Sequence, residues 1–429
     1  MTIPEIYSLF QKTSGVSTDT RKVGEGQFFV ALKGANFNGN LYADKAIESG
    51  ASYVLIDEKE YKKDERYILV GDCLHTLQLL ANYHRQQFDV PVLAITGTNG
   101  KTTSKELISV VLSKKYNVVA TFGNLNNHIG VPLTLLTITD KTELAIIEMG
   151  ANKIGDIREL CSFANPTHGV VVNVGKAHLE GFGSFEGVVQ TKTEMYDFLY
   201  NGNKVAFVNG SQEELKSNAQ RIKDVIYFQN DKTNTSTLLE TTSTLRIQTP
   251  DNEIIETNLV GAYNLDNIAI SYEIGKFFEV DKKEISRAIA SYVPTNNRSQ
   301  IVKTKQGAIL LDAYNANPFS MRVAIDNLAL AKTNKLAILG DMFELGDYAE
   351  SEHQEVIEYA TSKGVEAIFC GELFYKNKIK SSGQLFFKTR EEVIVYLKEN
   401  SSWLDRKYNL LIKGSRGMAL EKIVKEVKF

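Results

Sequence analysis

Short runs of apolar, mostly β-branched residues alternate with amphipathic stretches along the chain. This alternation favours α/β domains over all-α or all-β ones. In the first part of the chain the pattern predicts strands at 27–32, 53–57 and 67–70 and a helix at 73–88. A short apolar strand, 90–96, then runs into a Gly-rich turn. We therefore place the first domain boundary near residue 88.

The second part of the chain has the pattern of a doubly wound sheet, in which helices separate buried strands. Its predicted strands lie at 118–121, 144–149, 169–174 and 204–209. From 228 to 258 the chain is polar and Thr-rich, which predicts antiparallel strands or a surface excursion. A helix follows at 264–278. The segment 291–300, with Pro294 and two adjacent asparagines, predicts a linker.

The third part restarts the same alternation. It predicts strands at 308–312, 335–339 and 367–370, a helix capped by Ser320 that runs to 330, and a helix at 350–362. We therefore expect an α/β fold of three domains. They are a small mixed α/β domain (1–88), a central doubly wound domain (89–296) and a C-terminal Rossmann-like α/β domain (297–429).

The composition argues against nucleic acid and a membrane as partners of the chain. Its 429 residues carry a net charge of −3, from 49 basic and 52 acidic residues, so no overall basic surface for nucleic acid is expected. No stretch approaches the roughly 18 to 20 uninterrupted apolar residues of a membrane helix, and the first residues do not match a signal peptide. The three cysteines are widely spaced, which favours a reducing compartment. We expect a cytoplasmic protein without membrane insertion.

The strongest chemical motif is the segment Gly97-Thr-Asn-Gly-Lys-Thr-Thr103, which follows an apolar strand and opens a helix. Glycines allow backbone N–H groups to surround phosphate oxygens at a helix N-terminus. Lys101 can reach the β- and γ-phosphates, and the Thr102 hydroxyl can bind Mg²⁺. Ile95 stands where the longer phosphate-loop pattern has glycine, so this loop is the shorter Gly-x-x-Gly-Lys-Thr form. The alternative is a tight turn with a solvated lysine.

Further residues with charged or imidazole side chains could carry metal chemistry. Glu148 closes an apolar strand, where a carboxylate is costly to bury without a cation. His178 follows another apolar strand, and taken alone it is more typical of a structural or surface histidine. Lys192 and Glu194 share a predicted helix, and a Lys-x-Glu pair is typical of a solvated face.

Together these motifs resemble the Mur ligases, the ATP-dependent amide-forming enzymes of peptidoglycan synthesis. The shared features are the phosphate loop, Glu148, His178, Lys192, the segment Gly261-Ala-Tyr-Asn264-Leu-Asp-Asn267 and Arg298. The segments Asp19-Thr-Arg-Lys and Phe29-Val-Ala-Leu-Lys-Gly34 resemble the UDP-binding domain of the same family. The resemblance spans nearly the whole chain, from about residue 15 to 425.

Four longer stretches resemble the branch of the family that adds D-alanyl-D-alanine to a UDP-N-acetylmuramoyl-tripeptide, the last soluble step of precursor synthesis. They are Gly123-Asn-Leu-Asn-Asn-His-Ile-Gly-Val-Pro132, Asp312-Ala-Tyr-Asn-Ala-Asn-Pro-Phe-Ser-Met321, Leu339-Gly-Asp-Met-Phe-Glu-Leu-Gly346 and Lys413-Gly-Ser-Arg-Gly-Met418. The resemblance therefore implies a peptide ligase whose substrates are this nucleotide, the dipeptide and ATP.

The resemblance also assigns roles to individual residues. As catalytic groups it implies Lys101, Lys192 and Arg298, the last of these approaching the γ-phosphate. For ATP it implies Gly97, Thr98, Asn99, Gly100, Lys101, Thr102, Thr103, Asn264, Asn267, Arg298 and Asp312. For two Mg²⁺ ions it implies Thr102, Glu148, His178 and Lys192, with Lys192 carried as a carbamate. For the UDP-substrate it implies Asp19, Thr20, Arg21, Asn38, Gly39, Asn126 and Asn127. For the dipeptide and the peptide carboxylate it implies Asn315, Asn317, Lys413, Ser415 and Arg416.

Without the resemblance, the third-domain residues would all be interpreted as structural. Asn317-Pro318 would start a turn, and Lys413 and Arg416 would be solvated. Other functions left open are a sibling ligase that adds one amino acid, a folylpolyglutamate synthase-like enzyme, a P-loop kinase and a nucleotide-binding regulatory module. We expect a monomer that closes about the segments near residues 88 and 297. The third residue of the tripeptide, diaminopimelate or lysine, is not predicted.

Overall fold

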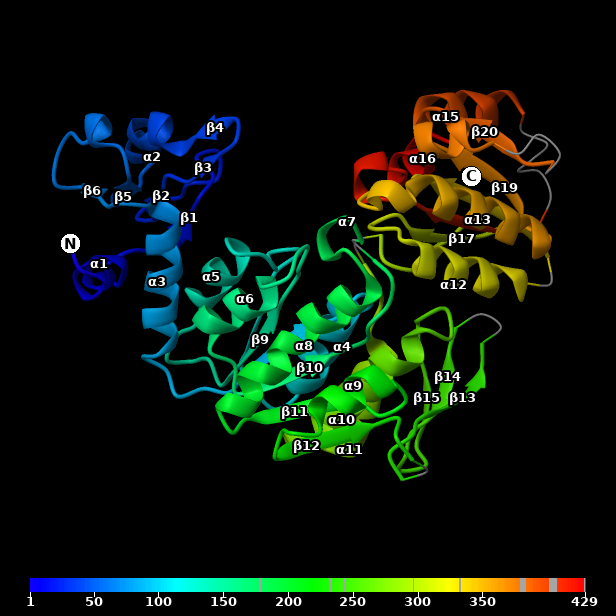
Figure 1. The fold of residues 1–429 in the computed structure, drawn as a ribbon, viewed down its shortest axis with the longest axis horizontal. Coiled ribbons are helices and arrows are strands. Elements are labelled where there is room, and N and C mark those ends of the chain that lie inside the picture. The colour runs from blue at the N-terminus through cyan, green and yellow to red at the C-terminus, as the bar shows by residue number, and fades with distance from the viewer. Residues whose placement is uncertain are drawn as a thin grey trace.

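The structure is a computed structural model that describes residues 1–429 except 178, 232, 242–243, 296, 332, 379–382, 401–406 and 428. Figure 1 shows an N-terminal and a C-terminal domain at opposite ends of a larger middle domain. Each of the three domains is built on its own, mainly parallel sheet. The predicted three-domain α/β fold is therefore confirmed, while the residue-level boundaries 1–88, 89–296 and 297–429 stay predictions.

The N-terminal domain has a parallel sheet in the order β1-β2-β5-β6. Its strands are β1 (Val16–Ser17), β2 (Phe28–Val30), β5 (Tyr53–Ile56) and β6 (Tyr67–Leu69). The hairpin β3 (Lys33–Gly34) and β4 (Phe37–Asn38) follows β2, and the helices are α1 (Ile3–Phe10), η1 (Gly39–Tyr42), α2 (Ala43–Glu48) and η2 (Lys59–Tyr61). The segments after β1, β2 and β5 thus meet at the carboxyl edge of one sheet.

Helix α3 (Cys73–Arg85) joins the first two domains. It packs against α1 on one side and against α5 and α6 of the middle domain on the other. The Asn82 amide donates to the carbonyl oxygens of Ser162 and Phe163, both at 3.1 Å. One continuous apolar cluster extends from the N-terminal sheet to one face of the middle sheet. These contacts hold α3 to both domains.

The middle domain has a six-stranded parallel sheet in the order β12-β11-β10-β7-β9-β8. Its strands are β7 (Val92–Thr96), β8 (Val118–Ala120), β9 (Leu144–Glu148), β10 (His168–Val171), β11 (Val205–Asn209) and β12 (Asp224–Phe228). One face is covered by α4 (Lys101–Leu112), α10 (Asn264–Phe277) and α11 (Lys282–Ser291). The other face is covered by α5 (Gly130–Leu135), α6 (Asp156–Ala164), α8 (Phe185–Asn201) and α9 (Glu213–Ala219), and the short α7 is Leu179–Phe182. The strand order reverses beside β7, which is where ligands bind in open α/β sheets.

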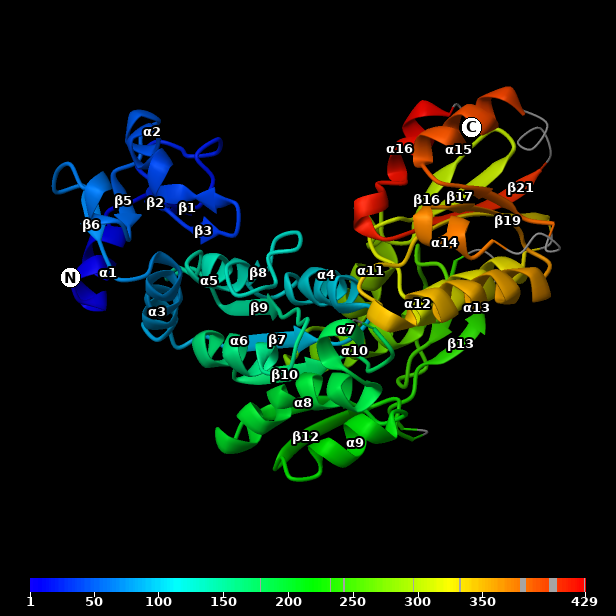
Figure 2. The same ribbon diagram turned by 45° about the horizontal axis from the view of Figure 1, so that its top comes forward.

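A separate antiparallel sheet extends from the middle domain, as the Thr-rich segment predicts. It consists of β13 (Thr237–Glu240), β14 (Arg246–Gln248) and β15 (Ile254–Glu256). Figure 2 shows this sheet on the side of the middle domain that carries the C-terminal domain.

The C-terminal domain has a six-stranded sheet in the order β16-β17-β21-β18-β19-β20, antiparallel only at β16. Its strands are β16 (Gln300–Lys303), β17 (Gly307–Asp312), β18 (Asn334–Gly340), β19 (Glu366–Cys370), β20 (Leu385–Phe387) and β21 (Tyr408–Lys413). Helices α12 (Pro318–Ala329), α13 (Ala349–Ser362) and α14 (Glu372–Lys376) cover one face. Helices α15 (Arg390–Glu399) and α16 (Glu421–Glu426) cover the other, and η3 (Gly346–Tyr348) and η6 (Arg416–Met418) lie in connections.

The structure corrects the predicted start of α12. The helix is capped by Asn317, whose Oδ1 accepts the Ser320 N–H at 2.8 Å, and not by Ser320. Ser320 instead completes a capping box, because its hydroxyl accepts the Asn317 N–H at 3.0 Å. Asn317-Pro318 therefore starts a helix, with proline in the first turn, where its missing N–H is not needed. Strand β12 was not predicted, and α3 ends at Arg85 instead of residue 88.

Candidate active site

The phosphate loop lies at the carboxyl end of β7, in the middle of the central sheet. Gly97 and Gly100 have φ of +151° and +77°. A Cβ on Gly100 would lie 2.4 Å from Oδ1 of Asn267, and one on Gly97 would lie 3.2 Å from the Asn173 backbone. Gly100 is thus favoured by close approach and by its left-handed φ, and Gly97 mainly by its φ. Helix α4 begins directly after Gly100, with its N-terminus facing the loop.

Lys101 curls back over the loop. Its ammonium donates to the carbonyl oxygens of Gly97, at 2.7 Å, and Thr98, at 3.1 Å. Burial lowers the pKa of Lys101 to about 8, with Glu148 opposing the shift and Arg298 adding to it. A bound phosphate would raise this pKa again, because an anion favours the charged form.

Glu148 lies beside the start of α4, at the end of β9. Its carboxylate is 1% exposed and accepts the Thr102 hydroxyl at 2.8 and 3.0 Å and the Asn126 amide at 2.8 Å. The backbone N–H of Glu148 donates to the Thr121 hydroxyl at 2.9 Å. All these partners are neutral, so among the described residues the buried carboxylate has no hydrogen-bonded cation.

That environment fits a divalent cation. A carboxylate and a threonine hydroxyl, completed by phosphate oxygens and water, are the ligands that Mg²⁺ takes at nucleotide sites. Within the described residues there is no group of three or more His, Cys, Asp or Glu side chains that could hold a metal. His178, the third predicted ligand, lies outside the described residues.

Lys192 and Glu194 are buried in α8, which corrects the expectation of a solvated face. Lys192 is 2% exposed, and among the described residues its ammonium has one recorded partner, the Phe182 ring at 5.4 Å. Burial lowers the pKa of Lys192 well below its ordinary value, and the charge of Lys101 adds to this. Glu194 is 1% exposed and accepts the backbone N–H groups of Gly155 and Arg158 at 2.8 and 2.9 Å, so it orders the first turn of α6.

A cleft of about 240 Å³ opens beside the phosphate loop, between the middle and C-terminal domains. It brings together ten of the predicted residues: Asn99, Gly100, Thr103, Asn264, Asn267, Arg298, Asp312, Asn315, Asn317 and Lys413. These residues come from distant parts of the sequence and from both domains, which indicates a site for a ligand that spans the domain boundary.

Side chains of α10 form the wall of the cleft behind the loop. Oδ1 of Asn267 accepts the Ser104 hydroxyl at 3.0 Å, and its amide donates to Oδ1 of Asn264 at 2.8 Å. Asn264 donates in turn to the carbonyl oxygen of Val260 at 2.8 Å. The two asparagines are therefore fixed against α4.

The facing wall comes from β17 and β21. Lys413 is 2% exposed and donates to Oδ2 of Asp312 at 2.6 Å and to the carbonyl oxygen of Asn315 at 3.0 Å. The solvated position considered for Lys413 is thus wrong. Asn317 donates to Oδ1 of Asn99 at 2.9 Å, which links this wall directly to the phosphate loop.

A second cavity, of about 150 Å³, lies on the other side of Glu148. Asn126, Asn127, Gly150 and Asp156 are among its lining residues. Asn127 also accepts the N–H groups of Ile129 and Gly130, at 3.1 and 2.9 Å, and so shapes the start of α5. Asn126 connects this cavity to the Glu148 carboxylate.

The predicted UDP-contact residues lie at the carboxyl edge of the N-terminal sheet. Asp19 accepts the Arg21 guanidinium at 2.9 and 2.8 Å, and this contact lowers the pKa of Asp19 to about 2. Thr20 lies in the turn that the Lys22 N–H closes by donating to the Asp19 carbonyl. These three residues are on a different domain from the cleft.

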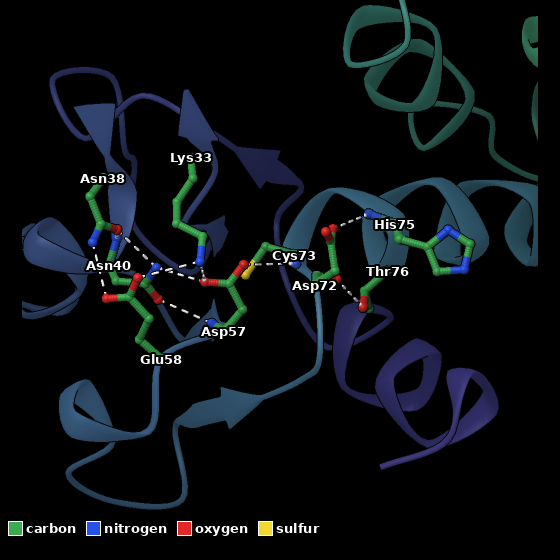
Figure 3. A network of polar contacts seen from close by, with 9 residues as sticks. All are labelled: Lys33, Asn38, Asn40, Asp57, Glu58, Asp72, Cys73, His75 and Thr76. Atoms are coloured by element: carbon green, nitrogen blue, oxygen red, sulfur yellow. Dashed lines mark hydrogen bonds and ion pairs between the residues drawn. The ribbon is translucent and has the colours of Figure 1, made fainter. Parts of the chain in front are cut away.

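Asn38 belongs to a polar network at the same edge (Figure 3), and Gly39 follows it at the start of η1. Asn38 donates to Glu58 at 3.0 Å and accepts from Asn40, while Asn40 donates to Asp57 at 2.8 Å. Lys33 lies 3.0 Å from the same Asp57 carboxylate. A Cβ on Gly39 would lie 2.5 Å from the Leu32 carbonyl oxygen, so this position requires glycine.

Ser415 and Arg416 are not among the described residues that line the cleft. The Ser415 hydroxyl accepts the Phe343 N–H at 3.0 Å, and Arg416 pairs with Glu421 at 3.0 Å. Their proposed contact with the dipeptide stays a prediction.

The sequence analysis missed several residues that line the cleft, among them Asn173, Tyr263 and Tyr314. Oδ1 of Asn173 accepts the Asn99 N–H at 2.9 Å, and the Asn173 amide donates to the Asn99 carbonyl oxygen at 3.0 Å. Its signal was available, because like Glu148 it is a polar residue after an apolar strand. Tyr263 and Tyr314 lie within recognised motifs but carry no polar signal of their own.

The chain has three α/β domains and a phosphate loop beside an interdomain cleft. This combination is typical of a nucleotide-dependent enzyme. Three family descriptions match the chain: "Mur ligase family, catalytic domain" at 12–85, "Mur ligase middle domain" at 95–275 and "Mur ligase, glutamate ligase domain" at 297–416. The chain belongs to the Mur ligase family, and its recognition as a ligase of this family is confirmed.

Three individual relatives are similar to this chain over nearly its full length. The UDP-N-acetylmuramoyl-tripeptide--D-alanyl-D-alanine ligase of Bacillus subtilis is 33% identical over 96% of this chain and 93% of its own. MurF from Acinetobacter baumannii has a TM-score of 0.88 at 25% identity, over 99% of this chain and 98% of its own. MurF from Thermotoga maritima, solved in complex with ADP, has a TM-score of 0.84 at 27% identity, over 96% and 97%.

Proposed function

We propose that this chain joins D-alanyl-D-alanine to UDP-N-acetylmuramoyl-tripeptide with hydrolysis of ATP to ADP and phosphate. The observation that carries this proposal is the interdomain cleft. It unites the residues predicted for ATP (Asn99, Gly100, Asn264, Asn267) with those predicted for the dipeptide (Asn315, Asn317, Lys413). The name of the Bacillus subtilis relative, which matches nearly the full chain, supports the same choice of substrates.

The reaction has two steps. A carboxylate oxygen of the tripeptide attacks the γ-phosphorus of ATP, the bond from phosphorus to the β-phosphate oxygen breaks, and ADP leaves. The neutral amine of the dipeptide then attacks the acyl carbon, the carbon–oxygen bond to phosphate breaks, and the nitrogen loses a proton. Catalysis of such steps is mainly positioning and charge stabilisation.

Residues of this chain supply that stabilisation. Lys101 and the backbone N–H groups of residues 97–103 hold the phosphates, and Arg298 approaches the γ-phosphate from the C-terminal side of the cleft. Two Mg²⁺ ions, held by Thr102, Glu148, His178 and Lys192, would neutralise charge on the transferring group. The fit of Glu148 to a cation, described above, supports this ligand set.

Lys192 is proposed to carry a carbamate. Burial favours the neutral amine, which is the form that reacts with CO₂ to give an anionic carbamate and a proton. The anionic oxygen would suit Mg²⁺, which an ammonium would repel. The absence of a recorded hydrogen bond or ion pair to its ammonium, among the described residues, supports a further group at this position.

The remaining assignments concern the nucleotide substrate and the setting. Asp19, Thr20, Arg21, Asn38 and Gly39 contact the UDP moiety, and Asn126 and Asn127 face the muramoyl-peptide across the second cavity. The enzyme works as a monomer in the cytoplasm, where ATP is available. All three cysteines are free and buried, in agreement with a reducing compartment. No helix among the described residues is long and apolar enough to cross a membrane.

The test is phosphate release from ATP and Mg²⁺ with UDP-N-acetylmuramoyl-tripeptide and D-alanyl-D-alanine, each omitted in turn. Release that requires every component, with a product heavier by one dipeptide, is expected. Release with a single amino acid in place of the dipeptide would indicate a sibling ligase, and ATP binding without release in any combination would contradict the proposal. Running the assay with diaminopimelate and with lysine at the third position identifies the tripeptide.

A further inference from the structure

Arg298 lies between two residues with left-handed backbone conformations. Asn297 and Ser299 have φ of +60° and +49°, in the left-handed region that non-glycine residues rarely adopt. Such conformations persist only where surrounding contacts enforce them, and they cluster at functional sites. Here the Ser299 N–H donates to Oδ1 of Asp312 at 3.1 Å, and the Ser299 hydroxyl bonds the Tyr263 hydroxyl at 2.7 Å. The backbone beside Arg298 is thus fixed at the edge of the cleft.

The side chain of Arg298 is held by a ring. Its guanidinium carbon lies 3.6 Å from the centroid of the Tyr314 ring, which is the shortest such contact in the described part of the chain. No hydrogen bond or ion pair from this guanidinium to another described residue is recorded. Stacking on a ring face leaves the N–H donors at the edge of the guanidinium available to an anion. Both side chains line the cleft.

We propose that Tyr314 is a positioning residue, which holds the Arg298 guanidinium over the cleft so that it meets the γ-phosphate of ATP. This inference rests on the proposed role of Arg298. The face of the ring performs this role, since no hydrogen bond of the Tyr314 hydroxyl to another described residue is recorded. Tyr314 therefore acts through Arg298 and does not itself touch the reacting atoms.

The experiment compares two Mg²⁺-nucleotides by calorimetry: ADP, which lacks the γ-phosphate, and the imido analogue of ATP, which has it. The variants are Tyr314→Phe, Tyr314→Leu, Arg298→Ala and the double variant Tyr314→Leu/Arg298→Ala. Tyr314→Gln repeats the comparison if the leucine variant does not fold. Tyr200→Leu is the matched control, because it removes another contact of arginine with a tyrosine ring, that of Arg221 at 5.6 Å, and neither residue lines the cleft.

Tyr314→Leu is expected to weaken binding of the imido analogue about tenfold, as expected for a desolvated cation–π contact, and to leave ADP binding within about twofold. Tyr314→Phe keeps the ring face and should retain parental affinity for both nucleotides. In the Arg298→Ala background, Tyr314→Leu should cause no further loss of affinity for the imido analogue, because the guanidinium that the ring holds is already absent. The kcat of Tyr314→Leu should fall with little change in the KM for the dipeptide.

Three results would overturn the inference and leave the proposed function intact. They are equal weakening of both nucleotides by Tyr314→Leu, a loss in Tyr314→Phe as large as that in Tyr314→Leu, and an undiminished effect of Tyr314→Leu in the Arg298→Ala background. If Arg298→Ala itself fails to distinguish the two nucleotides, the role of Arg298 is wrong and the inference falls with it. The phosphate-release assay on the parent chain tests the ligase reaction independently of both.

Discussion

The side-chain amide of Asn317 donates to Oδ1 of Asn99 at 2.9 Å, which joins the first residue of the α12 cap to the phosphate loop of another domain. Asn317 has two tasks, because its Oδ1 also caps α12. A change that keeps the cap and removes the amide donor separates them. This hydrogen bond is a direct link between the C-terminal domain and the phosphate loop.

Asn317→Asp should retain the helix cap, since aspartate is as good a cap as asparagine. Its carboxylate would face Oδ1 of Asn99 without a donor, so we expect kcat to fall about tenfold, the size of one lost hydrogen bond. Thermal stability should change little. Turnover and the melting temperature are measured together, with Asn218→Asp on the surface helix α9 as the control. Unchanged turnover would show that the bond to Asn99 does not serve catalysis and would leave Asn317 with the cap alone.

Closure of the domains is expected mainly about the second linker, after Tyr292. Helix α3 is bonded to both the N-terminal and the middle domain, so the segment near residue 88 has less freedom than the sequence indicated. Small-angle scattering with nucleotide and UDP-substrate together should show a more compact particle than with either alone. An unchanged profile would contradict closure at both segments.

Gly100→Ala should strongly weaken the binding of ADP. The added Cβ would lie 2.4 Å from Oδ1 of Asn267 and would require φ of +77°. Gly183→Ala is a matched control, because Gly183 has φ of +75° but nothing within 4 Å of the added Cβ. It should cost about 1–2 kcal/mol of stability from the left-handed backbone and leave ADP affinity unchanged. Calorimetry of ADP binding and chemical unfolding separate the two effects, and equal ADP affinity in both variants would exclude the packing argument.

Much of the site could be predicted because its signals are local. A Gly-rich turn between a buried strand and a helix is typical of a phosphate-binding loop, and Glu148 at the end of an apolar strand needs a partner. The burial of Lys192 and Glu194 could not be predicted, because the same spacing occurs on solvated helices. Only the packing of α6 and α7 against α8 buries this face of the helix. The stack of Arg298 on Tyr314 was equally hidden, since neither residue's neighbours in sequence indicate it.

The cap of α12 shows the limit of local rules. Asn317 and Ser320 are both good N-cap residues, and they lie three positions apart. Pro318 favours the earlier start, because proline suits the first turn of a helix. The sequence contained this signal, but it was interpreted as a turn.

Asn126→Ala should weaken Mg²⁺ binding without preventing folding. Its amide donates to Oε1 of Glu148, and loss of a group that orients a metal ligand costs roughly 10–100-fold in metal affinity. The Mg²⁺ concentration for half-maximal ADP binding should rise accordingly. Asn127→Ala is the control, since Asn127 lines the same cavity and its side chain accepts the backbone N–H groups of 129 and 130 instead of bonding Glu148. An unchanged Mg²⁺ requirement in Asn126→Ala would show that Asn126 does not orient the carboxylate.

Stability should fall as the pH is lowered from about 6.5 to 4, in part through His168. This ring packs against Phe277 and Phe278, with centroids 5.3 and 5.1 Å away, and burial lowers its pKa to about 4. The unfolded chain therefore binds a proton below pH 6.5 that the folded chain binds only below about pH 4. The stabilisation is complete above pH 6.5 and is lost on acidification.

His168→Phe removes this dependence while keeping an aromatic ring in place. Between pH 7.5 and pH 5, the free energy of unfolding should fall by about 2 kcal/mol less in the variant than in the parent. Urea unfolding at both pH values measures the difference, with exposed His75→Gln as the control. A parallel loss of stability in parent and variant would show that His168 titrates normally in the folded chain.

Lys192→Ala should reduce turnover by about a hundredfold or more, the usual cost of removing one group that stabilises transition-state charge. If Lys192 carries a carbamate, the vacancy left by the shorter side chain should accept a short carboxylic acid such as acetate or propionate. These acids should then restore part of the activity without bicarbonate, whereas they should not affect the surface variant Lys223→Ala. A carbamate on the parent should also appear in carbon NMR after equilibration with ¹³C-bicarbonate and be missing in Lys192→Ala. Near-normal turnover of Lys192→Ala would refute the assignment, because a buried lysine that serves only packing can be shortened without loss of the chemical step.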